Sequence, residues 1–122
     1  NFPLFTGFST ISKLQKERST LEKKVMEKRT IELSIQEEVF TSYQRFLTSK
    51  ENLVAAQAML EKLKEDYRII QKKYENGLAS MVDLTTIMAR LSQARSQLTL
   101  AKYDIFYNFY QLRKSVGEIP GL

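Results

Sequence analysis

No proline or glycine interrupts the chain between Ser12 and Tyr74, and this unbroken stretch constrains the fold more than any other feature. It is rich in Glu, Lys, Gln and Leu, which are good helix formers. At a rise of 1.5 Å per residue, a helix over this stretch would be about 90 Å long. This is several times the average length of a helix in globular proteins. The sequence therefore predicts one very long helix, which a small compact domain does not need.

Apolar residues recur along this stretch at alternating steps of four and three. Ten of the twelve positions on this seam are apolar, aromatic or alanine. The spacing is the heptad register of a helix that packs along its length in coiled-coil fashion. The seam positions are Ile35, Val39, Ser42, Phe46, Ser49, Leu53, Ala56, Leu60, Leu63, Tyr67, Ile70 and Tyr74.

A second apolar stripe runs beside the seam, at Met26, Leu33, Phe40, Leu47 and Val54. A two-stranded coiled coil needs only one seam, so two adjacent stripes give a broad apolar face. Such a face suits a helix that has neighbours on more than one side. We therefore expect this helix to belong to a bundle or a wall of helices.

The heptad register restarts after Gly77, and the second helix is expected to run to about Val116. Nine of its eleven positions are apolar. Gly117 is well placed to end this second helix, and Pro120 then prevents any extension. The positions of the second seam are Leu84, Ile87, Leu91, Ala94, Leu98, Ala101, Ile105, Asn108, Leu112, Ser115 and Ile119.

The segment YENGLASMVDL, residues 74–84, separates the two helical patterns. Asn and Gly adopt positive φ more easily than other residues, so Asn76-Gly77 can close the first helix. The hydroxyl of Ser80 can cap the second helix. The two helices are therefore expected to form a hairpin, with Leu78 and Met81 exposed at the bend or folded over it.

The first residues, NFPLFTGF, have alternating apolar positions around Pro3 and Gly7. Proline is confined to the start or the edge of a sheet strand, and Gly7 could supply a bulge or a sharp exit. The predicted order is thus a short strand and turn over 1–10 and a long helix over 11–75. The hairpin tip follows over 76–80, the returning helix over 81–117 and a C-terminal tail over 118–122.

The composition excludes most enzyme chemistry. The chain has no cysteine and no histidine, which removes disulfides, thiolate nucleophiles, imidazole bases and the usual zinc ligands. No Gly-rich phosphate loop or converging pair of carboxylates is visible. We predict no enzyme activity, no cofactor and no metal.

The net charge of +5 is spread along the helices, and its densest part runs from Lys13 to Arg29. This spread favours solvated helix faces with i,i+4 ion pairs over a nucleic-acid site. No apolar run approaches the roughly 20 residues of a transmembrane helix.

The residues at the bend are similar to a known family pattern. The segment YENGLASMVDL and the following ARLSQARSQLTLAKYD resemble the hairpin tip of TolC-like outer-membrane efflux proteins. In that family, Tyr-x-x-Gly-x-x-x-x-x-Asp precedes a helix rich in Ala, Gln, Arg and Leu. FPLFTGF resembles the Pro-Leu-Phe-x-Gly-Gly stretch at the end of the family's membrane strand, with Phe8 in place of the second glycine. In both, the two motifs lie at opposite ends of one long helix.

The resemblance implies an all-α fold, a long antiparallel hairpin of coiled-coil type that follows a short strand and forms part of an α-helical barrel. The chain would be the last part of the second of two repeats. The full-length protein would be a homotrimer in the outer membrane, anchored by barrel strands outside this chain. The hairpin would lie in the periplasm, in a passive conduit for efflux or type I secretion. The implied partners are a periplasmic adaptor and an inner-membrane pump.

The resemblance also implies roles for residues at the bend. Asp83 would face the channel entrance, where symmetry makes a ring that favours cations. Its alternative role is an acidic residue in the first turn of a helix. Tyr74 would hydrogen-bond to a neighbouring hairpin and keep the entrance closed, or it is simply a packed aromatic. Thr86 stands where the family has a second aspartate, and Ala79 stands where it has an arginine.

The bend itself would be the adaptor-docking tip, where small residues allow close approach and Leu78 supplies an apolar contact. Its alternative role is turn chemistry alone. Arg68, Lys72 and Lys73 could supply salt bridges near the tip. The tip residues are Asn76, Gly77, Leu78, Ala79 and Ser80.

Two other functions remain open from the sequence. The hairpin could belong to an adaptor or to a generic coiled-coil scaffold without channel activity, although an adaptor hairpin would be flanked by lipoyl-like halves. A basic helical nucleic-acid binder is the second, and the even spread of charge argues against it.

Overall fold

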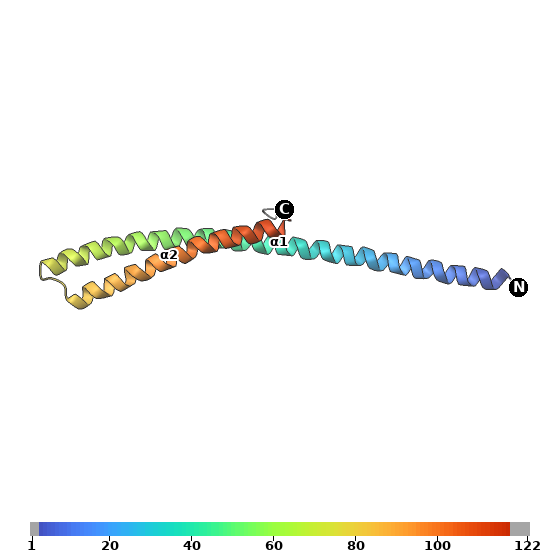
Figure 1. Ribbon diagram of the computed structural model, residues 1–122, viewed down its shortest axis with the longest axis horizontal. Coiled ribbons are helices and arrows are strands. Elements are labelled where there is room, and N and C mark those ends of the chain that lie inside the picture. The colour runs from blue at the N-terminus through green and yellow to red at the C-terminus, as the bar shows by residue number, and fades with distance from the viewer. Residues whose placement is uncertain (1–2, 118–122) are drawn as a thin grey trace. The chain divides into compact units, whose positions relative to one another are not determined.

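The computed structural model describes residues 3–117 and, within that range, contains two helices (Figure 1). Helix α1 spans Pro3–Glu75 and helix α2 spans Met81–Ser115, joined by the segment 76–80. The chain divides into two units, Asn1–Glu38 and Val39–Leu122. The first unit holds the N-terminal part of α1, and the second holds the hairpin. The predicted all-α helical hairpin is confirmed.

The predicted short strand over 1–10 is wrong for the residues described there, because Pro3–Thr10 is the beginning of α1. Residues 1 and 2 lie outside the described part. A strand must pair its backbone groups with another strand, whereas a helix satisfies them internally. Pro3 fits the first helical position because it lacks the N–H that would have no partner there. Gly7 costs this helix about 1 kcal/mol, which one glycine in a long helix can sustain.

Helix α2 ends two residues earlier than the range 81–117 predicted from the sequence, with Val116 as its C-cap. The N–H of Val116 donates to the carbonyl of Leu112 (3.2 Å), and that of Gly117 donates to the carbonyl of Lys114 (3.1 Å). Gly117 has a φ of +84°, the left-handed conformation that ends helices and that glycine adopts without strain. The tail over 118–122 and the seam position Ile119 lie outside the described residues.

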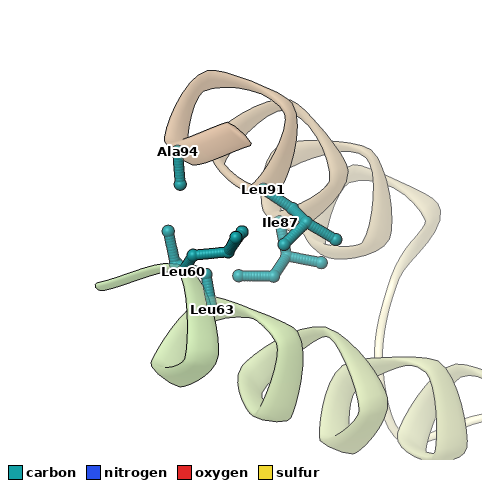
Figure 2. Packing of buried hydrophobic residues seen from close by; sticks show 5 residues of the cluster. All are labelled: Leu60, Leu63, Ile87, Leu91 and Ala94. Carbon is teal, nitrogen blue, oxygen red and sulfur yellow. The ribbon is translucent and has the colours of Figure 1, made fainter. Parts of the chain in front are cut away.

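In the second unit, the heptad seam forms the interface between the two helices. Every predicted seam position is buried or half-buried from Val39 to Ile70 of α1 and from Leu84 to Ser115 of α2. Figure 2 shows the centre of this interface, where side chains from both helices point toward one another. Tyr67 and Leu98 pack against this cluster. Its members are Leu60, Leu63, Ile87, Leu91 and Ala94.

Two small seam residues, Ser49 and Ala94, lie buried in the interface. The buried hydroxyl of Ser49 donates to the carbonyl of Phe46 in its own helix (2.7 Å), so its burial carries little penalty. Ala94 is only 2% exposed, which indicates that the backbones come close together at this level. Toward the other end of the interface, the rings of Phe46 and Phe109 lie 5.8 Å apart between centroids. Aromatic contacts of this kind stabilise packing beyond the area that they bury.

Many large apolar side chains remain outside this interface. On the second stripe, Leu47 is half-buried, whereas Phe40 and Val54 are exposed. The aromatic side chains of Tyr103 and Phe106 on α2 are also exposed. In the first unit, the exposed apolar residues of α1 include Phe8, Ile11, Leu14, Leu21 and Val25. The hairpin therefore buries only one of the two apolar stripes.

Replacement of Leu91 by alanine should lower the free energy of unfolding by about 2–3 kcal/mol, because Leu91 is 7% exposed at the centre of the seam. Leu100→Ala is the matched control, since Leu100 lies on the same helix and is 63% exposed. We expect its effect to be within about 0.5 kcal/mol. Urea denaturation followed by circular dichroism would measure both. Equal effects would show that the seam does not hold the hairpin together.

Candidate functional site

Helix α1 ends at Glu75 in a Schellman motif, a pair of backbone hydrogen bonds that closes the last turn of a helix. The N–H of Gly77 donates to the carbonyl of Tyr74 (3.0 Å), and the N–H of Leu78 donates to the carbonyl of Lys73 (2.7 Å). These bonds satisfy carbonyls that the helix leaves without partners. The chain therefore leaves α1 in a fixed direction.

Gly77 makes this helix ending possible. Its φ is +72°, in the left-handed region that residues with a Cβ enter at a cost of roughly 1–2 kcal/mol. A Cβ added at Gly77 would meet no atom within 4 Å, so the backbone conformation rather than space requires glycine. The side-chain amide of Asn76 donates to the carbonyl of Lys72 (2.9 Å) and adds to the cap. The prediction that Asn76-Gly77 closes the first helix is confirmed.

Helix α2 begins with a capping box formed by Ser80 and Asp83. The Ser80 hydroxyl oxygen accepts from the backbone N–H of Asp83 (3.1 Å). In return, Oδ2 of Asp83 accepts from the Ser80 backbone N–H (2.9 Å) and from the Ser80 hydroxyl (2.7 Å). Backbone donors that the helix start would leave without partners are thus satisfied. The prediction that Ser80 caps the second helix is confirmed.

The capping box favours the ionised form of the Asp83 carboxyl. The backbone N–H of Ser80 lowers the pKa of Asp83, and the Ser80 hydroxyl lowers it further, because both donate to the carboxylate. Asp83 is the acidic residue of the first turn of α2, where the helix dipole also favours a negative charge. The carboxylate therefore has the helix-start role that was one of its two predicted roles.

Tyr74 and Asp83, the two residues predicted at the channel entrance, lie on opposite sides of the turn. Tyr74 is in the last turn of α1 and is 40% exposed, more open than the seam residues before it. Within residues 3–117, no hydrogen bond or ion pair joins it to Asp83. The hydroxyl of Thr86 donates to the carbonyl of Val82 in its own helix (2.7 Å). The structure thus places both candidates beside the bend, and their role at an entrance stays a prediction.

The turn presents apolar side chains to solvent. Leu78 is 77% exposed, and Met81 and Val82 are exposed beside it at the start of α2. Ala79 is half-buried. Leu78 and Met81 are therefore exposed at the bend and not folded over it. The five predicted docking residues make up the turn over 76–80, where all but Ala79 are exposed, and their role in docking stays a prediction.

Basic residues lie along the last turns of α1. Arg68 is paired with Glu65 of the same helix, with Nη2 2.7 Å from one carboxylate oxygen and Nε 3.1 Å from the other. The hydrogen bond from Arg68 lowers the pKa of Glu65. Lys72 and Lys73 lie in the last turn, where the helix dipole favours positive charge. The predicted salt bridge of Arg68 is therefore local to α1.

The sequence predicts Ser80 as a cap and Asp83 as an acidic first-turn residue, but not the reciprocal pairing of the two. The signal was present as the pattern Ser-x-x-Asp before an apolar helix, a variant of the usual Ser-x-x-Glu capping box. In the part of the chain that the structure describes, no group of three or more acidic, cysteine or histidine residues is placed to hold a metal. Nor does either helix, over its described residues, have the length of apolar sequence that would cross a membrane.

Comparison with known families shows to which family the chain belongs. The model of the family described as outer membrane efflux protein matches residues 1–118. The chain belongs to the outer membrane efflux protein family. No curated protein and no solved structure matches it. The predicted membership of a TolC-like efflux family is thus confirmed, on a match that includes both helices and the bend.

Membership of the outer membrane efflux protein family sets the broad function. The family consists of transport channels and not of enzymes, which assigns the chain to a channel family. The family is located in the outer membrane, and its members are generally trimeric and interact with adaptor proteins. The helical hairpin of the described residues is consistent with the fold of this family.

Replacement of Gly77 by alanine should destabilise the hairpin by about 1–2 kcal/mol, because alanine must enter the left-handed region. Gly7→Ala is the matched control. Gly7 lies within α1 and has open space around its Cα, so alanine should raise helical content there. Circular dichroism during urea denaturation would measure both changes. Effects of the same sign would contradict the assignment of Gly77 as the αL residue of the turn.

The stability of the hairpin should fall at acidic pH partly through Asp83. Since the pKa of Asp83 is lower in the folded than in the unfolded chain, its stabilisation is present at neutral pH and is lost as pH falls through the folded pKa. Thermal unfolding at pH 7 and at about pH 2 would measure this loss. Asp83→Asn and Ser80→Ala should each reduce the difference between the two conditions. An unchanged difference in both variants would show that the capping box is not formed in solution.

Proposed function

We propose that this chain is the periplasmic helical-hairpin segment of a trimeric outer-membrane channel for efflux or type I secretion. The channel is a passive conduit, and an adaptor protein links it to an inner-membrane pump. Its tip opens like an iris when the adaptor docks. Three features support this function: the apolar surface outside the seam, the anionic entrance and the ordered turn.

The apolar surface outside the seam is the observation that carries the proposal. After the hairpin has formed, side chains on both of its helices remain exposed beside the seam, among them Val54 and Met59 of α1 and Met88 and Phe109 of α2. Large exposed apolar patches are rare on isolated soluble proteins and mark surfaces that other chains cover. Neighbouring hairpins in an α-helical barrel would cover both sides. The exposed second stripe of α1 has the same explanation.

The entrance is formed by Asp83 and Tyr74. Threefold symmetry would repeat Asp83 around the axis, and such rings of carboxylates favour cations. The capping box does not remove this charge, because Ser80 stabilises the ionised form of the carboxyl. Tyr74, whose ring is partly exposed, would hydrogen-bond to a neighbouring hairpin and help to keep the tips together.

The docking tip is the turn over 76–80. Its backbone is held by the Schellman motif on one side and the capping box on the other, so an adaptor would meet an ordered surface. Gly77 has no side chain and those of Ala79 and Ser80 are small, which would permit close approach. Leu78, which projects from this surface, supplies the apolar contact. An ordered tip reduces the entropy that docking would otherwise cost.

Single-channel conductance of the full-length protein in a planar bilayer tests this function. The native protein should carry small, cation-selective currents, and Asp83→Asn should reduce their selectivity because the entrance loses its charge. Asp104→Asn is the matched control: Asp104 is an exposed aspartate on the same helix, three heptads away. We expect that variant to keep the native selectivity.

The possible outcomes separate the parts of the proposal. Currents that respond equally to both substitutions would keep the channel and leave Asp83 with the helix-start role alone. An absence of current from folded, membrane-inserted protein would overturn the conduit. The hairpin would then be an adaptor-type or generic coiled-coil interaction module.

A further inference from the structure

The hydroxyl of Ser80 makes one hydrogen bond more than a capping box requires. In a capping box, the serine oxygen accepts from the N–H of the residue three positions on, and the side chain of that residue accepts from the serine N–H. Both bonds join Ser80 and Asp83, at 3.1 and 2.9 Å. In addition, the Ser80 hydroxyl donates to Oδ2 of Asp83 at 2.7 Å, the shortest of the three. This third bond satisfies no backbone donor of the helix start, so it acts on the carboxylate alone.

Other hydroxyls of α2 are bonded differently. Those of Thr85, Thr86 and Ser96 each donate to the backbone carbonyl four residues earlier in the helix. This is the usual bond of a serine or threonine inside a helix. Ser80 lies at the N-cap, where the backbone is extended. From this position its hydroxyl reaches a charged side chain and not a carbonyl of the helix.

Ser80 holds the carboxylate of Asp83 by one of its two oxygens. Both Ser80 donors go to Oδ2, and none of the residues that the structure describes donates to Oδ1. Two hydrogen bonds to one oxygen restrict the rotation of the carboxylate. Asp83 is nevertheless exposed. Its charge is therefore held in one place and remains accessible from solvent.

The charged groups near the turn do not contribute to this arrangement. The turn over 76–80 has no titratable residue, and the next one along α2 after Asp83 is Arg90. Within residues 3–117, none of the titratable residues in the last turn of α1 pairs with Asp83. The pKa of Asp83 is lowered first by the N–H of Ser80 and then by its hydroxyl, against an opposing effect of desolvation. The titratable residues of that last turn are Lys72, Lys73, Tyr74 and Glu75.

We propose that Ser80 is a positioning residue of the channel entrance, whose hydroxyl keeps the Asp83 carboxylate ionised and oriented. The inference rests on the entrance role proposed above for Asp83 and names the residue that sustains it. In the proposed trimer each carboxylate lies near two others, and like charges favour protonation. A hydroxyl donates a stronger hydrogen bond to a carboxylate than to a neutral acid, so Ser80 opposes that protonation. Without the hydroxyl, the ring loses its charge at a higher pH.

The pH dependence of ion selectivity tests this role. Reversal potentials of the full-length protein are measured in a planar bilayer under a gradient of KCl, between about pH 7 and pH 3. Native cation selectivity should fall with pH as the carboxylates become protonated. In Ser80→Gly the fall should occur at higher pH, because the hydroxyl no longer favours the ionised form. Glycine serves as an N-cap and keeps the backbone N–H, so the variant should fold and conduct normally at pH 7.

Two further variants separate the hydroxyl from other effects of the substitution. Ser80→Thr keeps a hydroxyl at the N-cap and should lose selectivity at the native pH. Ser96→Ala is the matched control, because it removes a hydroxyl of the same helix that donates to a backbone carbonyl. It should also behave as the native protein does. A shift of Ser80→Thr or Ser96→Ala as large as that of Ser80→Gly would overturn the proposal.

A purely structural cap predicts a different result. Ser80→Gly would then change assembly or conductance at pH 7 but not the pH at which selectivity is lost, and this outcome would overturn the proposal. Asp83→Asn distinguishes that failure from failure of the entrance itself. If Asp83→Asn loses selectivity at pH 7 while Ser80→Gly responds to pH as the native protein does, the entrance stands and only the role of Ser80 falls. If Asp83→Asn keeps native selectivity, the entrance role of Asp83 falls and that of Ser80 with it.

Discussion

The packing of one heptad seam against another is the interaction on which the hairpin depends. Each helix satisfies its own backbone hydrogen bonds, so only side chains decide which helix pairs with which. These side-chain contacts are few, because a hairpin of two helices has only one buried interface. Ala94 and Ser49 are small enough to let the two helices approach closely. Leu91 is buried between the helices. Larger apolar residues elsewhere have no place in such an interface and stay outside it.

The seam also determines where the chain must reverse direction and where α2 begins. Ile70 is the last buried or half-buried seam residue of α1, and Leu84 is the first of α2. The chain has to reverse between them, and it does so with a left-handed glycine and a capping box. Asp83 directly precedes Leu84, so the packing of that leucine fixes the start of α2 on which the carboxylate sits. The candidate entrance is thus positioned by the core and not by a flexible loop.

Much of this arrangement could be predicted from the sequence, because heptad spacing reports the one contact that matters most. The prediction fails at the ends of the seam, where Ile35 and Tyr74 are exposed. A seam residue is buried only where the opposite helix is present. The register that packs Leu60 with Ala94 would pair Tyr74 with the turn, and Ile35 lies in the first unit, outside the hairpin. Periodicity along one helix carries no information on how far its partner extends.

The N-terminal strand was mispredicted for a related reason. Alternating apolar residues around Pro3 describe a segment that can be a strand, but a strand exists only where another strand accepts its hydrogen bonds. The second apolar stripe shows the same limit: it indicates that a face is to be covered without naming what covers it. Under the proposed function, neighbouring hairpins would cover the side chains that the hairpin leaves exposed.

In the proposed channel, Asp83 would serve both the start of α2 and the entrance. In the proposed trimer, three carboxylates around one axis would repel each other, which raises the pKa of each and favours loss of the charge that attracts cations. The hydrogen bonds from Ser80 act in the opposite direction, since they lower the pKa of the same carboxyl. The cap needs only Oδ2, and the ring needs only the charge. The two roles therefore support each other, and Ser80 would help an anionic ring to stay ionised.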